Sequence, residues 1–119
     1  MKVRTLKKRL YKMCCDGFAD YCLRFDPRDD GEYSINHIYV DDDGDVCLES
    51  TDMENDTYDF TVANILHRLK NYSPDDYVYF MEEYEDGDTY AWDITGNYYE
   101  GYDYDGDETI FMYCCEMDE

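Results

Sequence analysis

Two copies of an Asp-x-Asp-Gly-Asp pattern are the residues whose type and spacing most directly suggest ion binding. They occupy residues 41–45 and 103–107. An EF-hand calcium loop needs an acidic first residue, glycine at the sixth position and a bidentate Glu at the twelfth. With its glycine in the sixth place, the first copy would run from Tyr39 to Ser50, and the second would begin at Gly101. Neither copy supplies these ligands, so we predict acidic hairpin turns, no metal site and no cofactor.

Cysteine and histidine are the other residue types with reactive or metal-binding side chains. The six cysteines are Cys14, Cys15, Cys22, Cys47, Cys114 and Cys115. Their spacing does not match that of zinc ligands, and no apolar export signal follows the basic N-terminus. We therefore expect reduced thiols buried in the core of a cytoplasmic protein. His37 and His67 accompany no recognisable nucleophile or phosphate-binding motif, so we predict no catalytic residues and no enzymatic activity.

Carboxylates dominate the rest of the sequence. The 119 residues include 31 Asp and Glu against 10 Lys and Arg, giving a net charge of −21. Residues 1–59 have a net charge of −7 and residues 60–119 a net charge of −14, and no Lys or Arg follows Lys70. Solubility needs a net charge of only about 2–8 in a small domain, and a larger charge repels itself. The excess charge predicts binding to a cationic partner.

The segment from Asn97 to Thr109 sets four tyrosines beside five acidic residues without a single cation. On one face of a strand, alternate side chains stand about 6.6 Å apart, a spacing comparable with that of nucleic-acid phosphates. Tyrosine adds rigid contact area and can stack on arginine. We therefore predict one partner-binding sheet face. Its predicted residues are Glu83, Glu85, Asp86, Asp88, Asp93, Glu100, Asp103, Asp105, Asp107, Tyr99, Tyr102 and Tyr104.

Apolar spacing and turn residues predict the elements that must position these side chains. Val62, Ile65 and Leu69 lie at helical spacing behind Thr61, a predicted N-cap, and a similar apolar stripe begins at Val3. Asp-Gly pairs predict hairpin turns at residues 30–31, 43–44, 86–87 and 105–106. We predict strands near residues 20–26, 33–40, 46–50, 77–84, 89–95, 98–103 and 108–115. The predicted fold class is α+β, with an apolar content of 44 % sufficient for a core.

The two halves of the chain resemble one another at a shift of 59 residues. Val3, Leu6, Arg9 and Leu10 then fall on Val62, Ile65, Arg68 and Leu69. We interpret this as an internal repeat of two similar helix-plus-antiparallel-strands units in one compact domain. Residues 1–59 form the first α-β-β-β unit, and residues 60–119 form the second, more acidic one. The alternative is that two α+β halves look alike because both use helix and hairpin chemistry.

In size, acidic excess and tyrosine content the chain resembles the nucleic-acid-mimic proteins of phages and mobile elements. Such proteins block host restriction or CRISPR nucleases, and the resemblance implies a location in the host bacterial cytoplasm. It implies an inhibitor that binds the basic DNA- or RNA-binding groove of a defence nuclease, where carboxylates replace phosphates. The expected partner is a basic nucleic-acid-binding protein, with no direct nucleic-acid or membrane contact, and the expected state is monomer or homodimer.

Three alternatives share the acidic composition. An immunity or antitoxin protein that neutralises a basic nuclease toxin would need the same acidic face. A halophilic protein would also be acidic, but its charge should be spread evenly, whereas six cations lie in residues 2–12. A calcium-binding module is the third alternative, and calorimetry that detected micromolar calcium binding would favour it.

Overall fold

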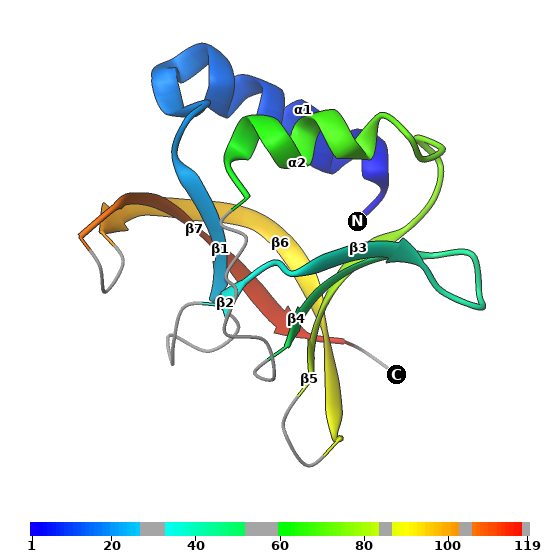
Figure 1. Ribbon diagram of the computed structural model, residues 1–119. Coiled ribbons are helices and arrows are strands. Elements are labelled where there is room, and N and C mark those ends of the chain that lie inside the picture. The colour runs from blue at the N-terminus through cyan, green and yellow to red at the C-terminus, as the bar shows by residue number, and fades with distance from the viewer. Residues whose placement is uncertain (27–32, 52–59, 84–86, 103–105, 118–119) are drawn as a thin grey trace.

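A computed structural model describes residues 1–26, 33–51, 60–83, 87–102 and 106–117. In this part of the chain, two α-helices and a π-helical turn accompany seven strands (Figure 1). The elements are α1 (Val3–Met13), η1 (Cys14–Phe18), β1 (Cys22–Asp26), β2 (Tyr33–Ser34), β3 (His37–Val40), β4 (Val46–Thr51), α2 (Val62–Leu69), β5 (Val78–Glu83), β6 (Thr89–Tyr102) and β7 (Glu108–Glu116). The predicted α+β class is confirmed. No helix among the described residues is long and apolar enough to cross a membrane.

Both helices bury one apolar stripe against the sheet. In α2 this stripe is Val62, Ile65 and Leu69, as the spacing predicted. The predicted N-cap is confirmed: the Thr61 hydroxyl accepts a hydrogen bond from the Asn64 N–H, and the Asn64 side chain accepts one from the Thr61 N–H. This reciprocal pair satisfies two N–H groups that helix geometry leaves without a partner.

The seven strands form one mixed sheet in the order β2-β1-β7-β6-β5-β4-β3. Four pairs of strands are antiparallel, as the hairpin turns predicted: β1 with β2, β3 with β4, β5 with β6, and β6 with β7. Two further pairs, β1 with β7 and β4 with β5, are parallel. Each parallel pair joins a strand from residues 1–59 to one from residues 60–119, so the strands of the two halves share a single sheet.

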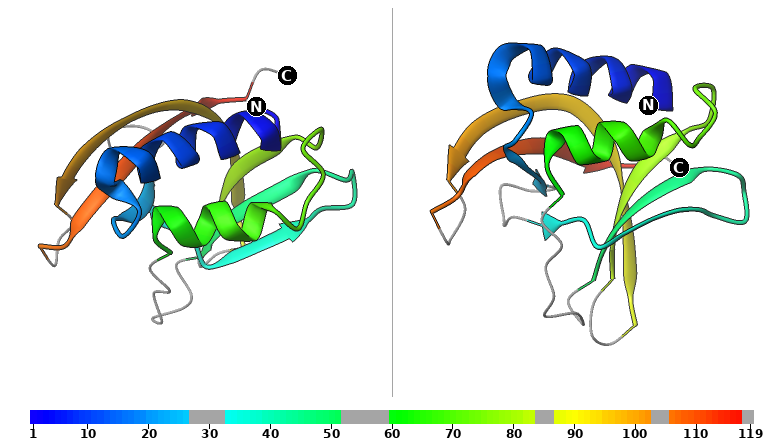
Figure 2. Two further views of the ribbon diagram at one scale, coloured as in Figure 1. Left: turned by 90° about the horizontal axis from the view of Figure 1, so that it is seen from above. Right: turned by 45° about the horizontal axis from the view of Figure 1, so that its top comes forward.

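The sheet is strongly curled, with α1 and α2 side by side across its concave side (Figures 1 and 2). Its edge strands β2 and β3 are separated in the chain only by Ile35 and Asn36, which brings the two edges together. The rings of Phe25 on β1 and Phe80 on β5 stack with centroids 5.0 Å apart, although β7 and β6 lie between these strands in the sheet. Curling therefore closes the core.

Strand alternation gives the sheet two faces with different roles. The inner face, which turns towards the helices, carries core residues such as Leu23, Leu48, Phe80 and Met112, all almost fully buried. The outer face carries the side chains at the intervening positions. Because the helices cover only the inner face, the outer face is the larger surface that the sheet offers to solvent or to a partner.

Strand β6 departs from the predicted boundaries in an informative way. Two strands were predicted, near residues 89–95 and 98–103, but β6 is continuous, with a β-bulge between Ile94 and Tyr98. Gly96 in this bulge has a φ of +85°, a left-handed conformation that glycine adopts at little cost. The bulge bends the strand so that it follows the curl of the sheet instead of ending it.

Candidate functional site

The outer face has a row of directly opposed side chains across β3, β4 and β5. Tyr39 lies opposite Cys47, and Cys47 lies opposite Tyr79. Cys47 is completely buried although it belongs to the outer face. Burial raises the pKa of its thiol, and hydrogen bonds from Tyr39 and Tyr79 offset this only in part. The thiol is therefore kept protonated beneath two tyrosines.

Tyrosine hydroxyls on the outer face donate hydrogen bonds to carboxylates. The Tyr39 hydroxyl lies 3.0 Å from a Glu49 carboxylate oxygen, and the Tyr79 hydroxyl lies 2.8 Å from an Asp41 carboxylate oxygen. The other described pairs are Tyr77 with Asp93 and Tyr99 with Asp26, the latter at 3.1 Å. These pairs bridge separate strands or strand ends. The tyrosine–carboxylate face, as we call this surface, comprises these eight residues.

Asp41 also organises the hairpin turn between β3 and β4. One of its carboxylate oxygens accepts the N–H groups of Asp43 and Asp45, each at 2.9 Å, while the other accepts the Tyr79 hydroxyl. Gly44 completes the turn with a φ of +87°, which confirms the predicted turn at residues 43–44. Partial burial opposes ionisation of Asp41, but these hydrogen bonds outweigh it and lower its pKa.

Asp45 follows in the same turn and shows the opposite effect. Its pKa is raised by partial burial and then by the negative charges of Asp41, Asp43 and Asp76. The turn thus concentrates negative charge enough to oppose ionisation of one of its own members. A cationic surface bound at this turn would relieve the repulsion between these carboxylates.

Aromatic rings pack together at the end of the tyrosine–carboxylate face formed by β6 and β7. Tyr99 on β6 stacks on Phe111 of β7 with centroids 4.9 Å apart, and its ring lies 5.1 Å from that of Tyr113. Its hydroxyl reaches Asp26, which is 3 % exposed. Tyr99 itself is 39 % exposed. This end of the face therefore offers tyrosine ring surface, with its carboxylate behind the rings.

A second acidic and aromatic cluster lies where β6 and β7 extend towards their hairpin. Glu100 and Tyr102 project from the inner side of β6, opposite Ile110 and Glu108 respectively. Burial, and then the negative charges of Glu108 and Glu100, raise the pKa of the nearby Tyr21. Tyr102 is 70 % exposed, so this cluster presents an open aromatic ring among carboxylates.

The residues predicted as one binding face divide between several places. Glu83, Asp93 and Tyr99 lie on the outer face, whereas Glu100 and Tyr102 belong to the inner side of β6. The prediction of a single face therefore fails for these last two, because they alternate with Tyr99 along one strand. Asp88 and Asp107 are exposed and come immediately before β6 and β7, respectively. Outside the described residues lie Glu85, Asp86, Asp103, Tyr104 and Asp105.

Sequence reasoning missed the carboxylates that the first half contributes to this face. Asp26, Asp41 and Glu49 all accept hydrogen bonds from tyrosines. Two of them follow another outer-face residue at a spacing of two, Asp41 after Tyr39 and Glu49 after Cys47. That alternation is visible in the sequence, although residues 1–59 have the smaller net negative charge.

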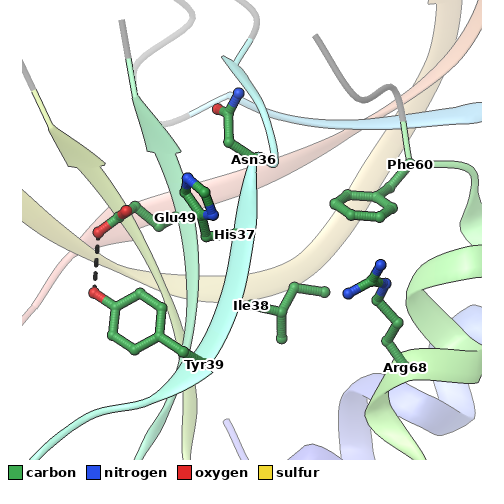
Figure 3. A pocket seen from close by; sticks show the side chains of 7 residues that line it. All are labelled: Asn36, His37, Ile38, Tyr39, Glu49, Phe60 and Arg68. Atoms are coloured by element: carbon green, nitrogen blue, oxygen red, sulfur yellow. Dashed lines mark hydrogen bonds between the residues drawn. The ribbon is translucent and has the colours of Figure 1, made fainter. Parts of the chain in front are cut away.

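A groove of about 410 Å³ runs beside β3 at the edge of the tyrosine–carboxylate face (Figure 3). Tyr39 and Glu49 lie on one side of β3, and Ile38 points to the other side, where Phe60 and Arg68 complete the wall. The Arg68 guanidinium stacks on the Phe60 ring, 4.7 Å from its centroid. The remaining lining residues are Asn36 and His37.

The cysteines are all free, but they are not all buried as predicted. Cys47 and Cys114 are buried, whereas Cys15 and Cys115 are exposed. Cys114 and Cys115 differ in exposure because consecutive residues of a strand such as β7 point to opposite faces.

Comparisons of the chain with known protein families, with curated proteins and with solved structures find no match.

Proposed function

We propose that this protein is a nucleic-acid mimic that occupies the basic DNA- or RNA-binding groove of a host defence nuclease and inhibits it. The tyrosine–carboxylate face is the observation that carries the proposal. Asp41 and Asp93, the two partly exposed carboxylates of this face, are held in place by tyrosine hydroxyls, so they would meet a partner without first losing side-chain freedom. The partner class follows from the charge, since a surface of this kind complements a groove lined by lysine and arginine.

The electrostatics of the described residues support this proposal. Asp41 and Glu49 accept hydrogen bonds from neutral groups, and neither has a cationic partner within the described part of the chain. A carboxylate that accepts one hydroxyl keeps further lone pairs for an incoming arginine. Positive charge is concentrated instead on α1, which carries Arg4, Lys7, Lys8, Arg9 and Lys12 on the opposite side of the sheet.

Tyrosine supports the proposal in a second way. Tyr39 and Tyr99 are each between a third and two-fifths exposed, with their hydroxyls fixed by carboxylates. The ring faces are thus available to guanidinium groups that normally contact nucleic acid. Mimicry by carboxylates alone would lack this stacking contribution.

Capture from a bacterial lysate on the immobilised protein, followed by elution with salt, tests the proposal. The captured partner should be a nucleic-acid-binding protein whose affinity falls steeply with ionic strength. Asp41→Asn with Asp93→Asn should weaken binding at least tenfold, because the amides keep the shape but lose the charge. Asp16→Asn with Asp20→Asn is the matched control, since both residues are exposed and lie outside this face. Equal affinities for the two double variants would contradict the proposal, whereas a toxin encoded beside this gene would favour an immunity protein.

We also infer that the two halves are copies of one α-β-β-β unit. Reciprocal hydrogen bonds support this: Val3 N–H donates to the Asp76 carbonyl at 2.8 Å and Val62 N–H to the Tyr21 carbonyl at 2.9 Å. The start of each helix thus bonds to the chain just before the first strand of the other half. A circular permutant that begins at residue 60 should fold with little loss of thermal stability. Failure of that permutant to fold would count against equivalent units.

A further inference from the structure

A second groove, of about 610 Å³, lies between α1 and α2. The two helices run side by side across the concave side of the sheet, so this interhelical groove and the tyrosine–carboxylate face lie on opposite sides of the molecule (Figure 2). The α1 members of its lining recur at spacings of three and four residues, which places them on one face of that helix. The lining consists of Arg4, Lys7, Lys8, Tyr11, Cys14, Leu66, Lys70 and Pro74.

The two helices lie antiparallel, as two backbone hydrogen bonds show. At the start of α1, the Arg4 N–H donates to the Pro74 carbonyl at 3.0 Å. Beyond the end of α1, the Ala19 carbonyl accepts the Ala63 N–H from the start of α2, also at 3.0 Å. The chain just after α2 therefore meets the beginning of α1, and this contact defines one end of the interhelical groove.

This arrangement makes the groove cationic at one end and apolar at the other. Its cations lie towards the start of α1 and the end of α2: Arg4, Lys7, Lys8 and Lys70. Its larger apolar side chains lie further towards the end of α1: Tyr11, Cys14 and Leu66. From the first to the last α1 member, the lining extends over about 15 Å of helix at 1.5 Å per residue. Tyr11 is 65 % exposed, so its ring is available to a ligand.

The lysines of the groove are not neutralised within the described part of the chain. Arg4 forms an ion pair with Asp75. Lys7, Lys8 and Lys70 have no carboxylate partner among the described residues, although the chain has 31 acidic residues. Three ammonium groups beside apolar surface are therefore available to an anion from outside.

We propose that this groove binds a small amphipathic anion, with a carboxylate or phosphate head group at the lysines and an apolar body over Leu66 and Tyr11. Ammonium groups donate charge-assisted hydrogen bonds to either head group. The apolar body removes the exposed Tyr11 ring and the Leu66 side chain from water. The groove volume falls within the range of about 300–1,000 Å³ that is typical of small-molecule sites.

The charges of the molecule favour this ligand over a polymer. A polynucleotide, or a second copy of this chain, would extend past the groove and meet the repulsion of a net charge of −21. A ligand with one or two charges is repelled far less, and its head group stays among the lysines. A bare inorganic anion would leave the apolar end of the groove in contact with water. The site does not depend on the proposed function, because it lies on the other side of the sheet.

Calorimetric titration of the full chain with decanoate, below the concentration at which decanoate forms micelles, tests the site. We expect one decanoate or one decyl phosphate per chain, and the tighter of the two identifies the head group. Decanol lacks the charge and inorganic phosphate lacks the chain, so each should bind about tenfold more weakly or worse. No binding of either amphipathic probe, or equally tight binding of decanol or inorganic phosphate, would overturn the proposal.

Paired lysine variants test where the head group binds. Lys7→Gln with Lys70→Gln should weaken decanoate binding about tenfold or more, because two charge-assisted hydrogen bonds are lost. Lys2→Gln with Lys12→Gln is the matched control: it makes the same change in net charge at exposed lysines outside the groove lining. Circular dichroism and thermal unfolding check that both variants fold. Equal affinities for the two variants would rule out a head group at these lysines.

A variant of the apolar end tests the orientation of the ligand. Tyr11→Ser removes an exposed ring, so the fold should be retained, and decanoate binding should weaken severalfold. Binding of inorganic phosphate should not change, since that probe has no apolar body. Decanoate affinity that is unaffected by Tyr11→Ser would contradict an apolar body at this end of the groove.

Discussion

The Tyr79 hydroxyl lies 2.8 Å from an Asp41 carboxylate oxygen and joins β5 to the β3–β4 turn, 38 residues away in the sequence. The same carboxylate accepts two backbone N–H groups of its turn. One acidic residue is thus held by three donors, none of which is a cation. Its negative charge is fixed in position and remains available to a cation from outside.

Removal of the Tyr79 hydroxyl should show how much its hydrogen bond to Asp41 contributes to stability and to the pKa of Asp41. Tyr79→Phe should raise the pKa of Asp41 towards its ordinary value and lower the free energy of unfolding by about 1 kcal/mol, the usual net contribution of a hydrogen bond. Carboxyl chemical shifts over a pH titration would measure the pKa. Tyr113→Phe removes a hydroxyl from the same face without touching Asp41, so it should leave that pKa unchanged; an equal shift in both variants would contradict the assignment.

The lowered pKa of Asp41 has a defined consequence for pH dependence. A folded-state pKa below the unfolded value of about 3.9 means that the stabilisation by Asp41 is fully present above that pH. It is lost as the pH falls through the lower folded-state pKa. Urea unfolding between pH 6 and pH 2 should therefore show a smaller acid-induced loss of stability for Asp41→Asn than for the wild type. Parallel pH profiles would exclude this contribution.

Asp45 should behave in the opposite sense. Its raised pKa means that ionisation costs more in the folded protein than in the unfolded chain. Asp45→Asn should therefore stabilise the protein at pH 7, and this gain should vanish once the pH falls below the ordinary aspartate pKa. Thermal unfolding at pH 7 and at pH 3 measures both effects. A variant that is less stable than the wild type at pH 7 would show that repulsion within the turn is not the dominant effect.

The β6 bulge makes a prediction about packing against α1. A Cβ at Gly96 would overlap the Arg9 side chain, whose guanidinium also donates to the Gly96 carbonyl at 3.4 Å. With the left-handed φ, Gly96→Ala should cost about 1–3 kcal/mol or more in unfolding free energy. Gly44→Ala is the matched control, because its φ is similar but its Cβ would meet open space. In the Gly96→Ala background, Arg9→Ala should recover part of the lost unfolding free energy, because it removes the side chain that the new Cβ would overlap. No recovery would mean that this overlap does not contribute to the loss.

The cap of α2 offers a test of local structure. Thr61→Ala removes the hydroxyl that accepts the Asn64 N–H, and this should cost about 1 kcal/mol. Thr61→Ser retains the hydroxyl and should cost much less in the same denaturant titration. Equal losses in the two variants would mean that the methyl group, not the hydrogen bond, is responsible.

Local sequence signals predicted the local structure well. The spacing of Val62, Ile65 and Leu69 reports a helix directly, and Asp43-Gly44 reports a tight turn, because each depends only on neighbouring residues. The parallel pairs were not predictable in this way. Nothing near β1 specifies that it pairs with β7, and the curl that stacks Phe25 on Phe80 depends on packing of the whole sheet.

The candidate site was harder to predict for the same reason. The acidic and tyrosine-rich composition of the second half predicted Asp93 and Tyr99, which lie on the outer face. Asp41 and Glu49 lie in the less acidic first half, and only the pairing of β3 with β4 and of β4 with β5 brings their tyrosine donors to the same face. Whether neighbouring acids such as Glu100 share a face with Tyr99 depends on strand register, which composition does not encode.

Competition with nucleic acid tests the central claim most directly. A labelled DNA duplex or guide RNA is first bound to the nuclease captured from the lysate, and this protein is then titrated into the complex at fixed salt. We expect complete displacement, with an apparent dissociation constant that rises in proportion to the nucleic-acid concentration. Binding of the protein that leaves the labelled nucleic acid in place, and that is unchanged by excess duplex or guide RNA, would contradict the claim.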